Sequence, residues 1–527
     1  MKWLSLYDLT GIQSYIFGSN VLQENLGGSF LVKQASNKWL KEAAREVGAE
    51  FQWSGGGNAM VTADSPDQAK RVATLLSAHL HDHAPGLYVA CAHQSWDGSD
   101  EDFLRQQQEL HRQLNEYKAS RWPPAVFDGA GVIEMCASTG EPAIWRDDSK
   151  WLGPAAKARL DHYEQARDDL QSLFRLKNYT DAKGNTHDLT WTAQFDYLGR
   201  SHGERSMLGV IHFDGNRMGE RFKNLSLSKL CQLSTAVNEA GKKTLIAALD
   251  WVLKNLSSIT DKDSGGFELY SDKDKNHCFP VRPIVYGGDD ITLVCDGRIA
   301  LDLAAELLRC WRKQTHNLPG GPAHACAGVA IVRVHYPFYR AYELAKKLCH
   351  ETKIKIRKEQ PDGASALDWE FIAGAGLATF RQRRDTLYEA ASGEQLHARP
   401  YYVIGEPLAT EPYRSWKWFR AILVNALQEQ EDIHTRFKQL AGILYQGRGV
   451  TKIHLQRWRD RFGLQRGEQK QESKGIWLPE PAHSPLQDGF ANNETPYLDA
   501  IELMDRVLPL RCYGDVEQVV PQPRETA

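Results

Sequence analysis

Two stretches of the chain show the same succession of strand-like and helix-like hydrophobic patterns. In the more C-terminal stretch, short apolar runs predict strands at 206–214, 281–286, 291–296 and 325–334. Apolar residues at helical spacing predict helices at 227–256, 299–311 and 338–350. The order of strand, helix, two strands, helix and strand is that of the ferredoxin-like split βαβ unit.

The first hundred residues repeat this order. The same patterns predict strands at 3–8 and 87–96, a hairpin at 51–63, and helices at 28–47 and 65–80. We therefore expect an α+β protein. Its parts are two ferredoxin-like domains at 1–115 and 204–360, a mostly helical linker at 116–203 with a helical stretch at 155–176, and a helical C-terminal domain at 361–527.

The segment IVYGGDDITLVCD (284–296) places two adjacent carboxylates, Asp289 and Asp290, after two glycines and between two apolar runs. Gly-Gly followed by Asp is typical of a tight hairpin turn, and this simpler interpretation needs no ligand. In a split βαβ sheet, however, the first and third strands are antiparallel neighbours. Asp214, at the end of the first strand, should therefore lie beside the turn, although a turn requires no third carboxylate.

Three carboxylates so close together repel one another, by about 1 kcal/mol per pair at 4 Å in water and about 4 kcal/mol at an effective dielectric constant of 20. Divalent cations remove this penalty, and hard oxygen ligands on a partly open ledge suit Mg²⁺ or Mn²⁺. Two such ions, about 3.5 to 4 Å apart, can activate an attacking hydroxyl and stabilise a leaving pyrophosphate. We predict that Asp214, Asp289 and Asp290 are catalytic metal ligands.

The glycines beside these carboxylates suggest nucleotide contacts. Gly287 and Gly288 would let a nucleotide approach the backbone without meeting a Cβ atom. Gly215, followed by Asn216, would leave backbone amides free for a phosphate after Asp214. We therefore include these four residues among the nucleotide-binding candidates.

The N-terminal repeat retains the glycines but not the turn carboxylates. Asp8 matches Asp214, and SGGGN (54–58) matches YGGDD (286–290), so that Gly57 and Asn58 replace the two aspartates. This half should not bind the catalytic ions. It either still cradles a nucleotide or serves only as a packing partner.

Two basic runs, KIKIRK (353–358) and RQRRD (381–385), suggest anion contacts. Charge runs are more often solvated faces. The first run follows the last helix of the second repeat, so a triphosphate contact by Lys353 or Lys355 is the alternative. Trp416 and Trp418, with the adjacent Phe419, form either core or a protein interface.

The overall composition indicates neither a basic electrostatic field that would bind nucleic acid nor a disulfide framework. The formal net charge is −3 over 527 residues, and the nine cysteines include no CxxC pair. The chain has no signal-like N-terminus and no run of 18 apolar residues. We therefore expect a cytoplasmic protein that does not contact a membrane.

Four segments together resemble the CRISPR polymerase family, the large tandem-palm subunit of type III CRISPR effector complexes. They are LTGIQSYIFGSNVLQENLGGSFLV (9–32), IHFDGNRMG (211–219), YGGDD (286–290) and CAGVAIVRVHYPFYRAYELAKKL (326–348). GGDD alone also occurs in diguanylate cyclases and polymerase palms. The GIQSYIFGS segment narrows the choice.

The resemblance implies two palm domains, the first degenerate and the second carrying two Mg²⁺ or Mn²⁺ ions. It implies that ATP is joined 3′ to 5′ into cyclic oligoadenylates in antiviral defence. The metal ligands would be Asp214, Asp289 and Asp290 with the Phe213 carbonyl. Ser29 and the 54–58 turn, with Ser54, Gly55 and Gly56, would face the acceptor nucleotide.

The resemblance also implies guide or target RNA and other effector subunits as partners. Family members often begin with an HD nuclease domain and carry a cysteine zinc motif between the palms. This chain starts directly at the first palm, and CASTGEPAIW (136–145) keeps only Cys136. We therefore expect neither DNase activity from an HD site nor a zinc site.

Three functions remain open from the sequence. The leading hypothesis is a metal-dependent nucleotidyltransferase that makes oligonucleotide signals. The alternatives are a large effector subunit with a scaffolding and target-sensing role, and a nucleotide sensor without turnover. The intact set of three carboxylates favours turnover, but no residue identifies the base.

Overall fold

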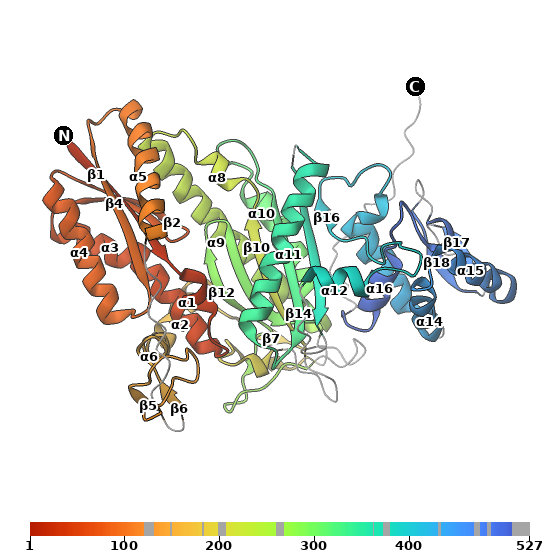
Figure 1. The fold of residues 1–527 in the computed structure, drawn as a ribbon. Helices are drawn as coiled ribbons and strands as arrows, with labels where there is room; N and C mark the ends of the chain where they lie inside the picture. Colours follow the sequence, from red (N-terminus) through yellow and green to blue (C-terminus); the bar gives the residue numbers. More distant parts are fainter. Residues whose placement is uncertain are drawn as a thin grey trace.

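A computed structural model describes residues 1–120, 131–147, 150–181, 184–198, 207–259, 268–361, 363–372, 380–430, 434–467, 475–481 and 486–508. The two predicted repeats lie side by side at one end and in the middle of the molecule. The C-terminal helices form the other end (Figure 1).

The first palm is a four-stranded sheet of order β2-β3-β1-β4. Its strands are β1 (Lys2–Thr10), β2 (Glu50–Gly55), β3 (Asn58–Ala63) and β4 (Tyr88–Trp96). The helices are α1 (Ile12–Phe17), the continuous α2 (Leu22–Lys33), η1 (Gln34–Trp39) and α3 (Leu40–Glu46), then α4 (Pro66–His83) and α5 (Asp100–Ser120). This is the predicted succession of elements.

The second palm repeats the topology within a larger sheet of order β12-β13-β10-β14-β15-β16. The palm strands are β10 (Met207–Gly215), β12 (Val281–Gly287), β13 (Asp290–Asp296) and β14 (Ala325–Arg333). The helices are α8 (Met218–Arg221), α9 (Leu227–Ile259), α10 (Ala300–Gln314) and α11 (Phe338–Glu359). The α+β fold with two tandem palms, expected from the sequence, is therefore confirmed.

Strand register relates the two palms residue by residue. In the second palm, β10 and β13 are antiparallel and Asp214 lies opposite Asp290. In the first palm, β1 and β3 are antiparallel and Asp8 lies opposite Asn58. The internal repeat is thus preserved at equivalent positions, with one carboxylate missing from the first pair.

The palms share one apolar core. Buried side chains of the first palm, such as Leu31 and Val61, belong to the same cluster as Val210 and Val294 of the second. The ring of Phe17 in α1 stacks on that of Tyr342 in α11, with centroids 3.6 Å apart. This burial fixes the first palm against one face of the second sheet.

Two strands extend the second sheet in a region that the sequence predicted to be helical. β15 (Ser365–Ile372) pairs parallel with β14, and β16 (Tyr401–Ile404) pairs antiparallel with β15. The polar residues of β15 obscured its strand character. Asp368 and Glu370 are buried, and each is neutralised by an arginine of the RQRRD run: Asp368 by Arg384 at 2.6 Å and Glu370 by Arg383 at 2.5 Å. The two arginines are therefore not on a solvated face.

The linker contains less helix than predicted. It has α6 (Pro154–Asp161), α7 (Tyr163–Leu173) and η2 (Phe195–Tyr197). It also has the short strands β5 (Trp145–Asp147), β6 (Lys150–Leu152), β7 (Tyr179–Thr180), β8 (Thr186–His187) and β9 (Leu189–Thr190), of which β9 pairs with β11 (His277–Cys278). Residues 121–130, 148–149, 182–183 and 199–203 of the linker lie outside the described part.

The C-terminal part is otherwise helical. Its elements are α12 (Phe380–Leu387), η4 (Pro412–Arg414), η5 (Trp418–Val424), α13 (Asn425–Glu429), α14 (His434–Leu444), α15 (Arg448–Phe462), β17 (Gln465–Gly467), β18 (Trp477–Pro479), η7 (Gln487–Gly489) and α16 (Tyr497–Met504). Trp416, Trp418 and Phe419 belong to its core. Within the described residues, no helix is long and apolar enough to cross a membrane.

Candidate active site

Asp214, Asp289 and Asp290 meet at one end of the second palm sheet. Asp290 lies opposite Asp214 in the strand register. Gly288, with φ of 65°, forms the turn before Asp289. The Asp289 side chain packs so closely on Gly215 that a Cβ added there would lie 2.8 Å from the Asp289 Cβ. The predicted clustering of the three residues is confirmed.

Burial and the neighbouring negative charge make Asp289 and Asp290 harder to ionise. Burial, followed by the charge of Asp214, raises the pKa of Asp289 to about 6 and that of Asp290 to about 7. The Asp290 side chain is still 45% exposed, so it remains open to the cleft beside it. The arrangement is one that a cation would stabilise.

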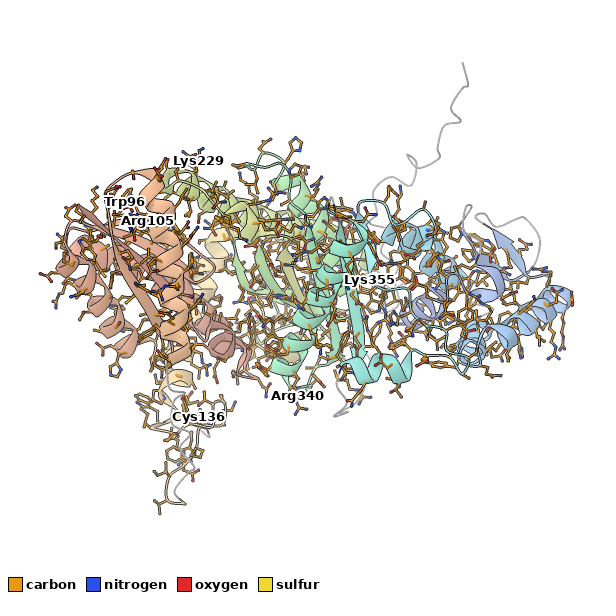
Figure 2. All side chains as sticks on the ribbon, turned by 45° about the horizontal axis from the view of Figure 1, so that its top comes forward. Trp96, Arg105, Cys136, Lys229, Arg340 and Lys355 are labelled. Carbon is orange, nitrogen blue, oxygen red and sulfur yellow. The ribbon has the colours of Figure 1, made fainter. Side chains whose placement is uncertain are left out.

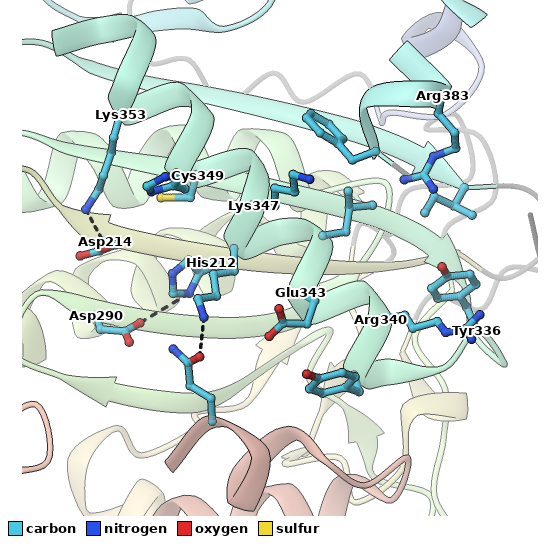
Figure 3. A pocket seen from close by; sticks show the side chains of 17 residues that line it. His212, Asp214, Asp290, Tyr336, Arg340, Glu343, Lys347, Cys349, Lys353 and Arg383 are labelled. Atoms are coloured by element: carbon cyan, nitrogen blue, oxygen red, sulfur yellow. Dashed lines mark hydrogen bonds and ion pairs between the residues drawn. The ribbon is translucent and has the colours of Figure 1, made fainter. Parts of the chain in front are cut away.

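Lys353 supplies a positive charge to this cluster. Its Nζ lies 2.6 Å from Asp214 Oδ2 and donates to the Gly215 carbonyl at 2.8 Å (Figure 3). Burial works against the charge of Lys353, but Asp214 outweighs it and the pKa of Lys353 is raised. A triphosphate contact by Lys353 stays a prediction.

His212, which the sequence analysis missed, forms the floor beside Asp290. Its Nδ1 lies 3.6 Å from Asp290 Oδ1 (Figure 3). The same atom lies 3.3 Å from Thr292 Oγ1. Burial lowers the pKa of His212 to about 4, so the ring is neutral at physiological pH. The signal in the sequence was its position two residues before Asp214, on the same side of the strand.

The donor set fits a hard divalent cation. Asp290 Oδ1 is buried and has no hydrogen-bond partner among the residues that the structure describes. Carboxylate oxygens are the preferred ligands of Mg²⁺ and Mn²⁺. Over the same residues, no three His, Cys, Asp or Glu side chains form a ready-made metal cluster, and Lys353 stands beside Asp214 as the nearby cation. Phe213 is buried in β10, and a metal contact by its carbonyl stays a prediction.

A cleft of about 740 Å³ opens beside Asp214 and Asp290, and we call it the basic cleft. One face of α11 supplies most of its cations, as Figure 3 shows. They are Arg340, Lys346, Lys347 and Lys353, and His350 lies on the same face. The sequence analysis identified only Lys353. The spacing of the others along one helix face was the available signal.

A second cavity, of about 350 Å³, lies between the palms, and we call it the inter-palm cavity. The predicted acceptor-side residues Ser29, Ser54, Gly55 and Gly56 line it, together with Gly287. Asp290 and Gln13 line both this cavity and the basic cleft. Asp290 therefore stands where the two spaces meet.

The helix α9 touches the glycine turns of both palms. Ser234 Oγ and Asn238 Nδ2 donate to the Ser54 carbonyl at 3.2 and 3.1 Å. A Cβ added to Gly241 would lie 2.0 Å from the Gly288 carbonyl oxygen. The sequence analysis did not identify these residues, although a glycine inside a long amphipathic helix indicates close packing.

Three predicted nucleotide contacts are placed differently. Lys355, labelled on α11 in Figure 2, lines neither cavity and donates to the Arg399 carbonyl at 3.3 Å. The amides of Gly215 and Asn216 are not free, because they donate to the carbonyls of Asp289 at 3.0 Å and His324 at 2.8 Å. The prediction that these amides bind a phosphate is wrong, because both already donate hydrogen bonds that hold the end of β10 against the chain at Asp289 and His324.

Comparison with known families gives the decisive observation. Residues 207–360 match the family model for the Cas10/Cmr2 second palm domain. The chain carries a second palm domain of the Cas10/Cmr2 family. The family resemblance seen in the sequence is thereby confirmed. No curated protein matches the chain significantly.

Solved structures match most of the chain at low identity and thus support the fold. A chain of a Csm1–Csm4 cassette in complex with one ATP is 15% identical, with a TM-score of 0.55 over 96% of this chain and 70% of that one. The cassette in complex with pppApA is 14% identical, with a TM-score of 0.54 over 95% and 69%. The cassette with cA4 is 16% identical, with a TM-score of 0.50 over 84% of this chain. There the match spans only 62% of the other chain, less than two thirds of its length.

Proposed function

We propose that this Cas10/Cmr2-type chain is a metal-dependent nucleotidyltransferase that joins nucleoside triphosphates, with ATP the expected substrate, 3′ to 5′ into cyclic oligonucleotide signals in antiviral defence. One observation carries the proposal. Asp290 lines both the basic cleft and the inter-palm cavity, and Asp214, opposite it in the strand register, lines the basic cleft. A donor and an acceptor nucleotide bound in the two spaces would have their reacting ends at these residues.

The basic cleft suits the donor triphosphate. Arg340, Lys346 and Lys347 offer several positive charges to the phosphates, and neutral His212 does not compete for a proton. Phosphoryl transfer depends mainly on positioning and charge neutralisation, so these residues need not act as acids or bases. Lys353 would place a positive charge beside Asp214 before substrate arrives.

The inter-palm cavity suits the acceptor nucleotide. Ser29 and the turn of Ser54 and Gly55 line one side, and Asp290 lies at the junction with the basic cleft. Asp214, Asp289 and Asp290 would hold Mg²⁺ or Mn²⁺. When bound, two such ions would activate the attacking 3′-hydroxyl and stabilise the leaving pyrophosphate.

The matched structures support this choice of substrate class. Csm1–Csm4 cassettes have been solved in complex with one ATP, AMPPNP, pppApA and cA4. These ligands belong to those proteins, and their series from ATP to a cyclic product is what a nucleotide-joining site would pass through.

The test is product formation from each of the four labelled triphosphates, with Mg²⁺ or Mn²⁺ and with or without candidate RNA activators. Asp289→Asn with Asp290→Asn should abolish the product. Asp8→Asn is the matched control, because Asp8 is the equivalent first-palm residue, is paired with Lys118 and lies opposite Asn58. A product unchanged in the double variant, or no product under any condition, would refute the proposal. ATP bound but recovered intact would favour a sensor.

A second candidate function is that of a large subunit in an RNA-guided effector. The observation in its favour is that the matched chains described above were each solved in a cassette with Csm4. Co-purification with partner subunits and guide RNA would support it. A preparation free of both from cells that express the whole set would count against it.

A further inference from the structure

Arg282 is a buried cation whose hydrogen bonds are unmade. It lies on β12, its exposed fraction is 0%, and it lines the inter-palm cavity. Its Nε, Nη1 and Nη2 atoms have no hydrogen-bond partner within the described parts of the chain. A guanidinium presents five N–H donors in a fixed plane, so this is a large unsatisfied group.

Another buried arginine, Arg420, has hydrogen-bond partners inside the protein. Arg420, 1% exposed, is paired with Asp302 at 3.2 Å and donates to the Leu508 carbonyl at 2.7 Å. Folding thus supplies Arg420 with an internal anion and a carbonyl. Among the described residues, Arg282 has neither.

The neighbours of Arg282 do not neutralise it. Its guanidinium lies 5.4 Å from the centroid of the Trp191 ring, a cation–π contact that makes no hydrogen bond. The nearby titratable groups are Tyr163, Tyr286 and Arg167. Burial lowers the pKa of Arg282 to about 10, so the side chain is still cationic at neutral pH.

Asp169, the carboxylate beside Tyr286 in the inter-palm cavity, already accepts hydrogen bonds. Asp169 accepts from Lys33 Nζ at 2.6 Å and from the Tyr286 hydroxyl at 2.9 Å. Lys33 also lines the cavity and offsets the Asp169 charge. An anion approaching Arg282 would therefore not face an unpaired carboxylate at Asp169.

The position of Arg282 relative to Asp290 indicates what that anion is. Arg282 pairs with Val294, which is four residues after Asp290 on β13. Four residues of strand span about 13 Å, and an even spacing puts the side chains on the same face of the sheet. A nucleoside triphosphate is long enough to extend from a 3′-hydroxyl at Asp290 to a 5′-phosphate at Arg282.

We propose that Arg282 anchors a triphosphate subsite in the inter-palm cavity, which takes the 5′-phosphates of the acceptor nucleotide while its 3′-hydroxyl points to Asp290. The identity of the ligand rests on the proposed function. The need for an anion rests on the unmade hydrogen bonds of Arg282, because an uncompensated buried charge is costly until a counter-ion arrives.

The first test is whether replacing Arg282 raises or lowers the melting temperature of the protein. Arg282→Met should raise the melting temperature of the ligand-free protein by about 2–4 °C, because it removes an unpaired buried charge. Arg420→Met is the matched control and should lower it, since it strands Asp302. If Arg282→Met lowers the melting temperature as Arg420→Met does, or fails to fold while Arg282→Lys folds without binding, Arg282 is structural and the proposal is overturned.

The second test is binding without turnover. In an Asp289→Asn, Asp290→Asn protein kept in EDTA, calorimetric titrations would use inorganic tripolyphosphate, ATP, AMP and adenosine. Arg282→Met should weaken one tripolyphosphate and ATP site by about 10- to 100-fold and leave adenosine binding unchanged. Arg282→Lys should restore part of the affinity. Arg340→Met with Lys347→Met should weaken a different site, in the basic cleft.

These measurements separate the two proposals. Arg282-dependent tripolyphosphate binding in a protein that makes no product would support the subsite while refuting the proposed function. Normal product formation together with triphosphate affinities unaffected by Arg282→Met would overturn the subsite and leave the proposed function standing.

Discussion

Asp289 and Asp290 should destabilise the metal-free protein at neutral pH. Burial and the neighbouring Asp214 raise their pKa values from the ordinary 3.8 to about 6 and about 7. Each pKa unit corresponds to about 1.4 kcal/mol, which gives an upper bound of several kcal/mol for the pair. Asp290 is 45% exposed, so solvent screening reduces its share. We expect that Asp289→Asn with Asp290→Asn stabilises the metal-free protein at pH 8 by on the order of 2 kcal/mol.

The pH dependence follows from the direction of these shifts. A carboxyl group whose folded-state pKa is raised binds more protons in the folded chain than in the unfolded chain. Its contribution to stability therefore grows as the pH falls from 8 through the folded pKa values near 7 and 6. The gain is complete below the unfolded pKa of about 4. The double Asn variant lacks this contribution, so its stability should change less between pH 8 and pH 5.

Urea unfolding in EDTA at pH 5, 6, 7 and 8 would measure both effects, followed by far-UV circular dichroism. Asp8→Asn is the control, because Asp8 is paired with Lys118 and has Asn58 opposite it in place of a second carboxylate. Adding Mg²⁺ or Mn²⁺ at pH 8 should raise the unfolding midpoint of the wild type and not that of the double variant. A double variant that is no more stable than the wild type in EDTA at pH 8 would refute the electrostatic reasoning.

Three further predictions concern positions around the site. Lys353→Met should reduce the initial rate of product formation by about 100-fold, because it removes the cation beside Asp214. Lys355→Met, on the same helix, is the control and should keep the rate. Equal losses in the two variants would contradict the assignment. Gly215→Ala should lower the rate of product formation by about 100-fold, because the new Cβ would displace Asp289. Gly219→Ala is the control and should keep the rate, because a Cβ there meets open space. A normal rate in Gly215→Ala would show that Asp289 tolerates the shift. Asn238→Ala should raise the KM for the acceptor nucleotide by about tenfold, because it removes the hydrogen bond to the Ser54 carbonyl. Thr235→Ala, at an exposed position of the same helix, is the control. An unchanged KM in Asn238→Ala would mean that the first-palm turn needs no support from α9.

The central part of the site was predictable from the sequence because it depends on local patterns. Strand and helix periodicity gave the βαββαβ order, and the order alone places the end of the first strand beside the turn before the third. The structure confirms this by placing Asp214 opposite Asp290. The internal repeat was predictable for the same reason, since Asp8 and Asn58 occupy the equivalent register.

The remainder depends on partners distant in the sequence. Strand β15 was missed because Asp368 and Glu370 look exposed until Arg384 and Arg383 are known to neutralise them. Hydrophobic patterns also cannot tell that Arg282, a polar residue in an apolar strand, faces a cavity formed with the other palm. A basic run likewise does not reveal which of its lysines faces the carboxylates, because that depends on the rotation of the helix.

The contacts of α9 have a consequence for movement between the palms. The same helix holds the first-palm turn through Ser234 and Asn238 and meets the second-palm turn at Gly241. The seven residue steps from Ser234 to Gly241 span about 10 Å of helix, so this rigid segment sets the spacing of the two turns. A partner that tilts α9 would therefore change the separation of the two turns without touching either one.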